Sequence, residues 1–301
     1  MSLNLGAKFL QAPLIRISGS SCLNDPFEFQ LTKSSSSKVE SVLRESLNNE
    51  YDHSEIMKRF WTHGIISLTE TNDNLLMWSH YADEHKGMLV SFEIDLNSPF
   101  DFFAIHEEHE SCYFSKVNYR KFRQFNTEVS IDNLDEVKLH YMLSKSDEWI
   151  YEKEHRFVIP FHEADVILLD KGNELFNDVL SDLGVNGSEV ESLEDKVFID
   201  VRKFRIEKSA LFKIWVLSSH VGAMFFKIVN PDAIKSVYLG CKVDSNSTRS
   251  LFEEHIQEPI KSTFYDSDKS SIRNVYKSSL NSDRFELEFS TYSASFLDYL
   301  S

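Results

Sequence analysis

Several features that would define a protein class are scarce in this chain. Its 301 residues contain only three cysteines and nine glycines. Cys22, Cys112 and Cys241 lie far apart and are odd in number, so no disulfide framework or cysteine-based zinc spacing is visible. No window approaches about 18 uninterrupted apolar residues, and the N-terminus lacks a basic stretch followed by a long apolar run. We therefore expect a cytoplasmic protein that makes no use of a membrane.

Positive charge is scarce as well. Lys and Arg number 32 against 48 Asp and Glu, which gives a net charge of −16. Sequence-blind nucleic-acid binding over a diffuse basic surface is not expected, because such affinity comes from Lys and Arg that neutralise phosphates. A local basic cleft remains compatible with these numbers. The acidic surplus would also attract a basic partner.

What the chain does have is apolar and aromatic content. Hydrophobic residues make up 42%, and Phe alone occurs 24 times. Such a composition indicates a folded protein, and the length allows a substantial core in one large domain or two.

The stretch from Asn74 to Phe92 holds the densest polar cluster. Its apolar residues recur at mixed three- and four-residue spacing, which predicts a short helix up to Tyr81. Gly87 is expected to end this part of the chain in a left-handed conformation, and Met88 to Ile94 to continue as a strand. The Trp-Ser-His-Tyr cluster at residues 78–81 needs many polar partners, which suggests a site. The alternative is a helix–strand corner whose aromatic residues are merely well packed.

A second dense motif runs from Lys145 to Ile159. Glu152 and Glu154 would point the same way if this segment is extended. Two like charges on one face repel, unless Lys145, Arg156 or a ligand hydroxyl lies between them. The alternative is a surface strand of alternating charge.

Other polar residues are weaker candidates. Asn24-Asp25-Pro26 is a turn signal, which leaves Asp25 and Glu28 either as functional carboxylates or as parts of a capped turn. The run from His106 to Glu110 invites a metal site, but it lacks the HExxH spacing, so a solvated acidic loop is predicted.

The remaining pattern alternates helices and strands. Residues 162–205 look acidic and helix-like with a turn at 184–187, and residues 209–228 are strongly apolar, fit either for the core or for a partner. Strands are predicted at 14–17, 64–69, 112–119, 157–159, 233–240 and 284–291, and helices within 33–60 and at 134–145 and 247–256.

Four blocks in order resemble the bacterial family known as domain of unknown function 2971. They are Asn24 to Glu28, Leu76 to Gly87, Lys145 to Arg156, and Tyr238 to Cys241. The resemblance implies a compact α+β domain over residues 1–301, with a mixed or antiparallel central sheet, flanking helices and residues 162–228 as an elaboration. It also implies a place in prophage, toxin–antitoxin or phage-defence loci.

The order of these motifs is similar to the Arg–Ser–Glu layout of ADP-ribosyltransferases. That similarity assigns Arg16 to the NAD pyrophosphate, because its planar fork suits bidentate bonds, and Ser79 to the nicotinamide ribose. Glu154 would stabilise the positive charge that develops as nicotinamide leaves, and Glu152 would activate the acceptor. Trp78, His80 and Tyr81 would complete the NAD-binding cluster, with Trp78 or Tyr81 stacked on nicotinamide.

The expected function is therefore a toxin that transfers ADP-ribose from NAD to a nucleic acid or a protein, with an antitoxin or a chaperone as a further partner. One alternative is a nuclease that binds Mg²⁺ through Asp25, Glu28, Glu152 and Glu154, with His80 or His85 as base. Another is a binding module without catalysis.

Overall fold

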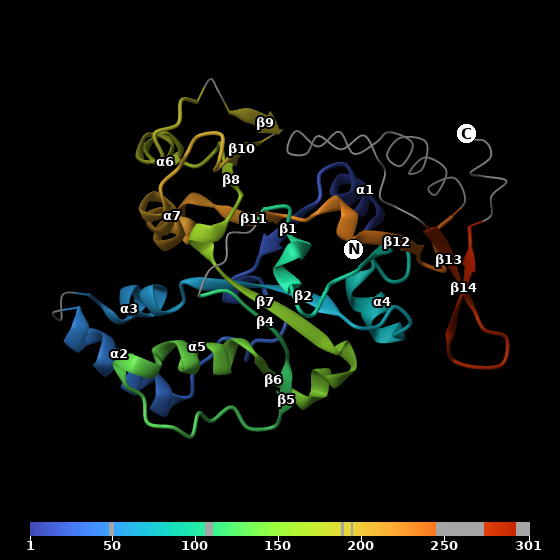
Figure 1. The fold of residues 1–301 in the computed structure, drawn as a ribbon, viewed down its shortest axis with the longest axis horizontal. Helices are drawn as coiled ribbons and strands as arrows, with labels where there is room; N and C mark the ends of the chain where they lie inside the picture. The colour runs from blue at the N-terminus through green and yellow to red at the C-terminus, as the bar shows by residue number, and fades with distance from the viewer. Residues whose placement is uncertain (48–50, 106–110, 188–189, 194, 245–273, 293–301) are drawn as a thin grey trace. The chain divides into compact units, whose positions relative to one another are not determined.

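The structure is a computed structural model that describes residues 1–47, 51–105, 111–187, 190–193, 195–244 and 274–292 (Figure 1). Helices and strands follow one another irregularly, and several sheets contain antiparallel pairs, so the fold class is α+β, as predicted. No helix in these ranges is long and apolar enough to cross a membrane. The predicted helix at 247–256 lies outside the described residues.

The chain groups into two compact units. The first takes in residues 1–15, 69–107 and 228–301, and the second takes in residues 16–68 and 108–227. Each unit combines stretches that are distant in sequence, and neither is a simple half of the chain. That all 301 residues form one domain therefore stays a prediction.

The first unit is built on a four-stranded sheet in the order β14, β13, β12, β3. The predicted strands at 88–94, 233–240 and 284–291 and the helix up to Tyr81 are confirmed, although the strands are shorter than expected. The elements of this unit are α1 (Leu3–Gln11), α4 (Leu75–Tyr81), β3 (Met88–Phe92), η2 (Pro99–Phe102), η6 (Pro231–Ala233), β12 (Ile234–Leu239), β13 (Asn274–Leu280) and β14 (Leu287–Thr291).

The junction after α4 differs from the prediction. Asp83, Glu84 and His85 are the residues with positive φ, at 50°, 52° and 71°, and Gly87 is not among them. A Cβ on Gly87 would overlap the Met1 carbonyl and lie 2.9 Å from the carbonyl oxygen of Ala82. Gly87 is thus required by the close approach of two backbone segments and not by a left-handed conformation.

The second unit contains three sheets and a group of helices. The strand orders are β2, β7, β4 in one sheet, β5, β6 in another, and β1, β11, β8, β10, β9 in the third. Its elements are β1 (Leu14–Ile17), η1 (Ser20–Cys22), α2 (Lys33–Ser46), α3 (His53–Phe60), β2 (His63–Thr69), β4 (Tyr113–Lys116), β5 (Asn118–Arg120), η3 (Ile131–Asn133), α5 (Leu134–Met142), β6 (Ser144–Ser146), η4 (Asp147–Glu152), β7 (Glu154–Pro160), η5 (Phe161–Glu163), β8 (Val166–Asp170), α6 (Phe176–Asp182), β9 (Glu191–Leu193), β10 (Lys196–Asp200), α7 (Lys208–Val221) and β11 (Met224–Ile228). The first two residues of β1 and the last residues of β2 and β11 fall in the range of the first unit.

Helices α2, α3 and α5 pack together through an apolar cluster (Figure 1). Val39, Phe60 and Val137 come from these three helices and are each at most 3% exposed. Asp52 caps α3: it accepts a hydrogen bond from the Glu55 amide, while the Glu55 side chain accepts one from the Asp52 amide. One or two helices were predicted within 33–60, and the structure has two, α2 and α3.

Two predictions for this unit are wrong. The helix predicted to reach residue 145 ends at Met142, and the next residues form β6. Residues 162–205, predicted as helix-like, instead hold β8, β9 and β10, with α6 as the one α-helix among the described residues of this range. The run Val166 to Asp170 pairs with β10 along its whole length, so the apolar residues there fill strands and not a helix face.

Candidate functional site

Five charged side chains meet inside the second unit and are called here the buried ion cluster. They are three carboxylates and two cations, and each is at most 8% exposed. Such groups are rarely buried unless they are paired with one another. The members are Glu28, Lys145, Glu152, Glu154 and Arg156.

The chain brings these residues together from three places. Glu28 follows the turn after η1, Lys145 lies in β6, and the rest span the junction of η4 and β7. Lys153, between Glu152 and Glu154, has a φ of 45° and turns the chain there. The prediction that Glu152 and Glu154 both lie in an extended segment is therefore wrong, since Glu152 ends a 3₁₀ helix. The predicted cation between them is confirmed: the Lys145 ammonium lies 2.5 Å from Glu152 and 3.3 Å from Glu154.

Arg156 makes the tightest set of contacts. Its Nε lies 2.7 Å from Glu154 Oε1, and its Nη2 donates to Glu154 Oε2 at 2.9 Å and to Glu28 Oε2 at 2.7 Å. Its Nη1 donates to the Met142 carbonyl at 2.5 Å. Lys145 completes the cluster with an ion pair of 3.0 Å to Glu28. A planar guanidinium that uses three of its nitrogens in this way fixes the carboxylates in place.

The cluster separates the protonation behaviour of its carboxyls. Burial raises the pKa of Glu28, against the opposing effect of Arg156 and Lys145. For Glu154, burial also favours the neutral form, but the Arg156 guanidinium and the Lys145 ammonium outweigh it and hold the pKa below its usual range. Glu154 is therefore ionised at neutral pH, and Glu28 is the carboxyl that takes up a proton more readily.

Ser67 is a neighbour of Glu154 that sequence reasoning missed. It lies in β2, next to β7 in the three-stranded sheet, and its side chain forms a hydrogen bond with the Glu154 carboxylate. Ser67 is exposed whereas Glu154 is buried. The only signal in the sequence was its place in a predicted core strand.

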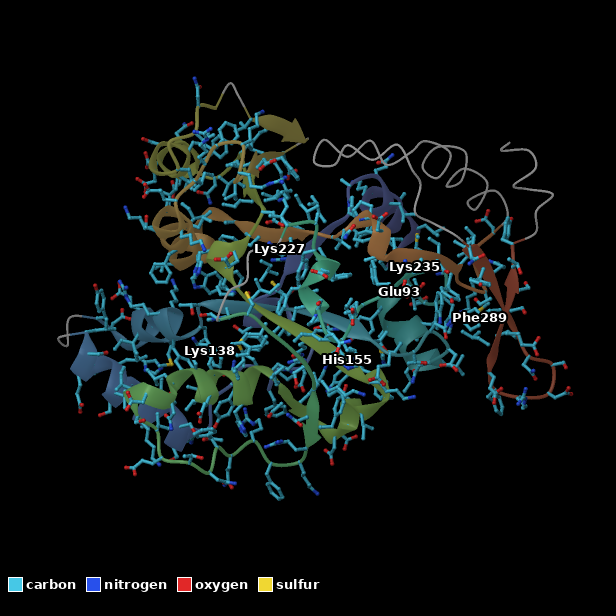
Figure 2. The ribbon with its side chains drawn as sticks, in the orientation of Figure 1. Glu93, Lys138, His155, Lys227, Lys235 and Phe289 are labelled. Carbon is cyan, nitrogen blue, oxygen red and sulfur yellow. The ribbon has the colours of Figure 1, made fainter. Side chains whose placement is uncertain are left out.

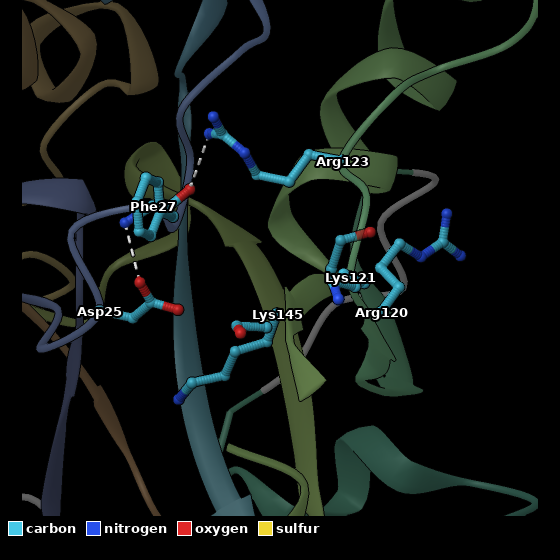
Figure 3. Close-up of a pocket in the computed structure, with 8 residues that line it drawn as sticks. Asp25, Phe27, Arg120, Lys121, Arg123 and Lys145 are labelled. Carbon is cyan, nitrogen blue, oxygen red and sulfur yellow. Dashed lines mark hydrogen bonds between the residues drawn. The ribbon is translucent and has the colours of Figure 1, made fainter. Parts of the chain in front are cut away.

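A cavity of about 170 Å³ adjoins the cluster through Lys145 and is called here the Asp25 cavity (Figure 3). Asp25 Oδ1 accepts a hydrogen bond of 2.9 Å from the Phe27 amide, so the predicted capped turn is confirmed. Asp25 Oδ2 and Ser144 Oγ are buried and have no hydrogen-bond partner in the described structure. The lining residues are Asp25, Phe27, Arg120, Lys121, Arg123, Ser144, Lys145 and Ser146.

In the first unit, Trp78 is a core residue. It is 2% exposed, and its indole Nε1 donates to the Asn72 carbonyl at 2.7 Å. It packs with Ala82 and Leu287, and Phe289 of β14, which is labelled in Figure 2, packs against the same cluster. The well-packed corner is therefore the interpretation that fits Trp78, and the indole is not placed to stack on nicotinamide.

The other predicted NAD-binding residues are at the surface. Ser79, His80 and Tyr81 are exposed along α4. They belong to the first unit and the buried ion cluster belongs to the second, so the prediction that both line one cavity stays a prediction.

Arg16 is also exposed, but within the second unit. It lines a second cavity of about 280 Å³ with Lys58, Phe161 and Trp215 among others, and no member of the buried ion cluster lines that cavity. The guanidinium next to Glu154 is that of Arg156. The predicted role of Arg16 at the NAD pyrophosphate has no contact with Glu154 to support it.

Those residues considered for a metal site that the structure describes are not arranged around one. Within the described ranges, no group of three or more His, Cys, Asp or Glu side chains is placed to hold a metal ion. In the buried ion cluster, Lys145 and Arg156 occupy the space among the carboxylates. His85 lies in the first unit, and the His106 to Glu110 run lies outside the described residues.

Comparison with known proteins matches part of the chain to a family model. The family model described as protein of unknown function (DUF2971) matches residues 77–157, which begin inside α4 and include four of the five members of the buried ion cluster. This match confirms the family resemblance predicted from the sequence blocks. No curated protein and no solved structure matches the chain.

Proposed function

We propose that this protein transfers ADP-ribose from NAD and that the reaction takes place at Glu154. The observation that carries the proposal is the pairing of an ionised, immobilised Glu154 with an exposed serine, Ser67, on the neighbouring strand. A serine that supports the nicotinamide ribose beside the glutamate is the role that the similarity to ADP-ribosyltransferases assigned to Ser79. In this proposal Ser67 takes the place of Ser79 against the nicotinamide ribose.

The chemistry needs a fixed negative charge beside the sugar. The bond between ribose C1 and nicotinamide breaks, nicotinamide leaves with the electron pair, and positive charge develops on the ribose. An ionised carboxylate that is already oriented stabilises this charge without further reorganisation. The acceptor then bonds to C1 and gives up a proton, for which Glu152 is the proposed base.

The charge of the site supports the same substrate. The cluster has one more carboxylate than it has cations, and the nicotinamide ring of NAD is cationic. Arg120 and Arg123 line the adjoining cavity and take the pyrophosphate in this proposal, instead of Arg16. Both halves of NAD would then meet groups of opposite charge within the second unit.

The test is release of nicotinamide from NAD by the purified chain. We expect wild-type protein to release nicotinamide and the Ser67→Ala and Glu154→Gln proteins to release at least about tenfold less. Glu148→Gln is the matched control, because Glu148 is an exposed carboxylate in the neighbouring η4. Thermal unfolding of each variant separates loss of chemistry from loss of folding. Wild-type protein that releases no nicotinamide and labels nothing in a cell extract with labelled NAD would overturn the proposal.

Such a reaction inside a cell consumes NAD and modifies macromolecules, which fits a toxin in a toxin–antitoxin or phage-defence locus. The net charge of −16 supports a basic antitoxin or chaperone as partner. Co-expression with the neighbouring gene products, followed by purification, tests for that partner. The magnesium-dependent nuclease gains no support from the described residues, because the cations among the cluster carboxylates are supplied by the chain itself.

A further inference from the structure

Residues 119–125, called here the basic–aromatic segment, alternate cations with aromatic rings. The sequence reads Tyr-Arg-Lys-Phe-Arg-Gln-Phe, so three cations fall within four residues of a chain whose net charge is −16. The segment starts in β5 and continues past it, and three of its residues line the Asp25 cavity. This is the local basic cleft that the overall charge left open.

The cations on this wall are available to an anion. No ion pair involves Arg120, Lys121 or Arg123 within the described part of the chain. Arg123 uses its Nη1 to bond the carbonyls of Phe27 and Gln30, at 3.4 and 2.8 Å. The one carboxylate in the lining is Asp25, so the cavity mouth has a positive excess.

The floor of the cavity presents unpaired polar atoms. Asp25 and Ser144 are 4% and 7% exposed, and Asp25 Oδ2 and Ser144 Oγ have no partner among the described residues. A buried carboxylate oxygen without a donor is costly, so an N–H or O–H group of a ligand would be stabilised there. The ligand therefore combines a phosphate-like anion with a hydroxyl or amino group, as a nucleotide does.

Exposed aromatic rings flank the same cations. Phe27 lines the cavity and is 58% exposed, with the Arg123 guanidinium 5.1 Å from its ring centroid (Figure 3). Phe122 lies between Lys121 and Arg123 in the chain and is 72% exposed. Exposed aromatic faces beside phosphate-binding cations are the arrangement on which unpaired bases stack. A duplex cannot use them, because its bases are already stacked.

We propose that the basic–aromatic segment and the Asp25 cavity form a binding site for single-stranded nucleic acid. Phosphates of the strand contact Arg120, Lys121 and Arg123, and bases stack on Phe27 and Phe122. A base amino group or a sugar hydroxyl of one nucleotide enters the cavity and donates to Asp25. In the proposed function Arg120 and Arg123 also take the NAD pyrophosphate, so NAD and the strand would compete for these two cations; that competition rests on the proposed function, whereas the binding does not.

Fluorescence anisotropy tests this proposal by measuring how a labelled 12-nucleotide single strand binds to the full chain. With about three phosphate contacts, raising the salt from about 50 to 200 mM should weaken binding by roughly 20-fold. An unlabelled duplex of the same length should compete at least about tenfold less well, and so should polyglutamate, which shares only the negative charge. These measurements contain no NAD, so their outcome is separate from that of the nicotinamide assay.

The variants have a matched control in the hairpin of β13 and β14. We expect Phe122→Ala to weaken binding about fivefold or more. Lys121→Gln should reduce the slope of log K against log salt concentration by the contribution of about one phosphate contact. Phe285 is 99% exposed and follows Arg284, so Phe285→Ala and Arg284→Gln remove an exposed aromatic ring and a cation elsewhere and should leave binding unchanged. The proposal would be overturned if the chain did not bind the strand, or if it preferred the duplex or polyglutamate. It would also be overturned if Phe285→Ala and Arg284→Gln weakened binding as much as Phe122→Ala and Lys121→Gln.

Discussion

Glu154 and Arg156 lie two residues apart in β7 and bind each other through two hydrogen bonds, of 2.7 and 2.9 Å. Alternate residues of a strand face the same side of the sheet, so this pair is set by the strand itself. Arg156 then reaches Glu28, which is 128 positions away in sequence. The Glu154–Arg156 pair thus positions the guanidinium for the contact with Glu28, which joins the turn after η1 to the sheet.

Arg156→Gln should destabilise the protein strongly. It removes the guanidinium that compensates Glu154 and Glu28, and uncompensated buried charges cost about 3–5 kcal/mol. Urea unfolding should show this loss, with Arg284→Gln, an exposed arginine, as a control within about 0.5 kcal/mol of wild type. If Arg156→Gln unfolds at the wild-type urea concentration, the cluster does not hold this part of the fold together.

The sequence allowed the members of the cluster to be named but not their geometry. Glu152, Glu154, Lys145 and Arg156 were recognised because like charges two residues apart need a cation. The left-handed Lys153 could not be foreseen, because nothing marks a lysine for a conformation that favours glycine. Glu28 could be suspected only as part of a turn, since its contact with Arg156 depends on tertiary packing.

The helix α4 was predicted for the right reason, but the role of its tryptophan was not. Helical spacing places Trp78 on the apolar side, and a polar indole N–H there can serve either a ligand or the backbone. In the structure the indole N–H donates to the backbone carbonyl of Asn72, and the sequence gives no sign of that hydrogen bond. The strands at 166–170 and 196–200 were missed because acidic residues around them outweighed short apolar runs, which periodicity cannot assign.

Trp78→Phe separates packing from NAD binding. Phenylalanine keeps most of the apolar contact but leaves the Asn72 carbonyl without its donor, which should cost about 1–3 kcal/mol. Because Trp78 is 2% exposed, the KM for NAD in nicotinamide release should stay at the wild-type value. A raised KM with unchanged stability would instead place the indole at the substrate.

Gly87→Ala should destabilise the first unit because its methyl group would overlap the Met1 carbonyl and crowd Ala82. Both neighbours are backbone, so relief requires a shift of the chain, and we expect a loss of about 1–3 kcal/mol in chemical unfolding. Gly172→Ala is the control, since a Cβ there would meet only Asp170 Oδ1 at 3.4 Å. Equal stability of the two variants would contradict the close approach seen at Gly87.

His63 should make the stability of the second unit depend on pH between about 4 and 6.5. The ring is 7% exposed, with Nδ1 2.9 Å from Thr62 Oγ1 and Nε2 3.2 Å from the Ser111 carbonyl. Burial, helped by the nearby Lys138 ammonium, lowers the pKa of His63 to about 4. Below pH 6.5 the unfolded chain binds a proton that the folded chain refuses, so stability is full above that pH and falls as the pH drops towards 4.

The size of this effect follows from the same shift, because each pKa unit is worth about 1.4 kcal/mol, which gives about 3 kcal/mol in all. Urea unfolding of wild type and of His63→Gln, measured every half pH unit, should show the slope in wild type only. The carboxyls of the buried ion cluster are present in wild type and in His63→Gln. Their titration therefore cancels when the stability curve of one protein is subtracted from that of the other. Parallel curves would mean that His63 is protonated as readily in the folded chain as in the unfolded one, which the Thr62 and Ser111 contacts of its neutral ring argue against.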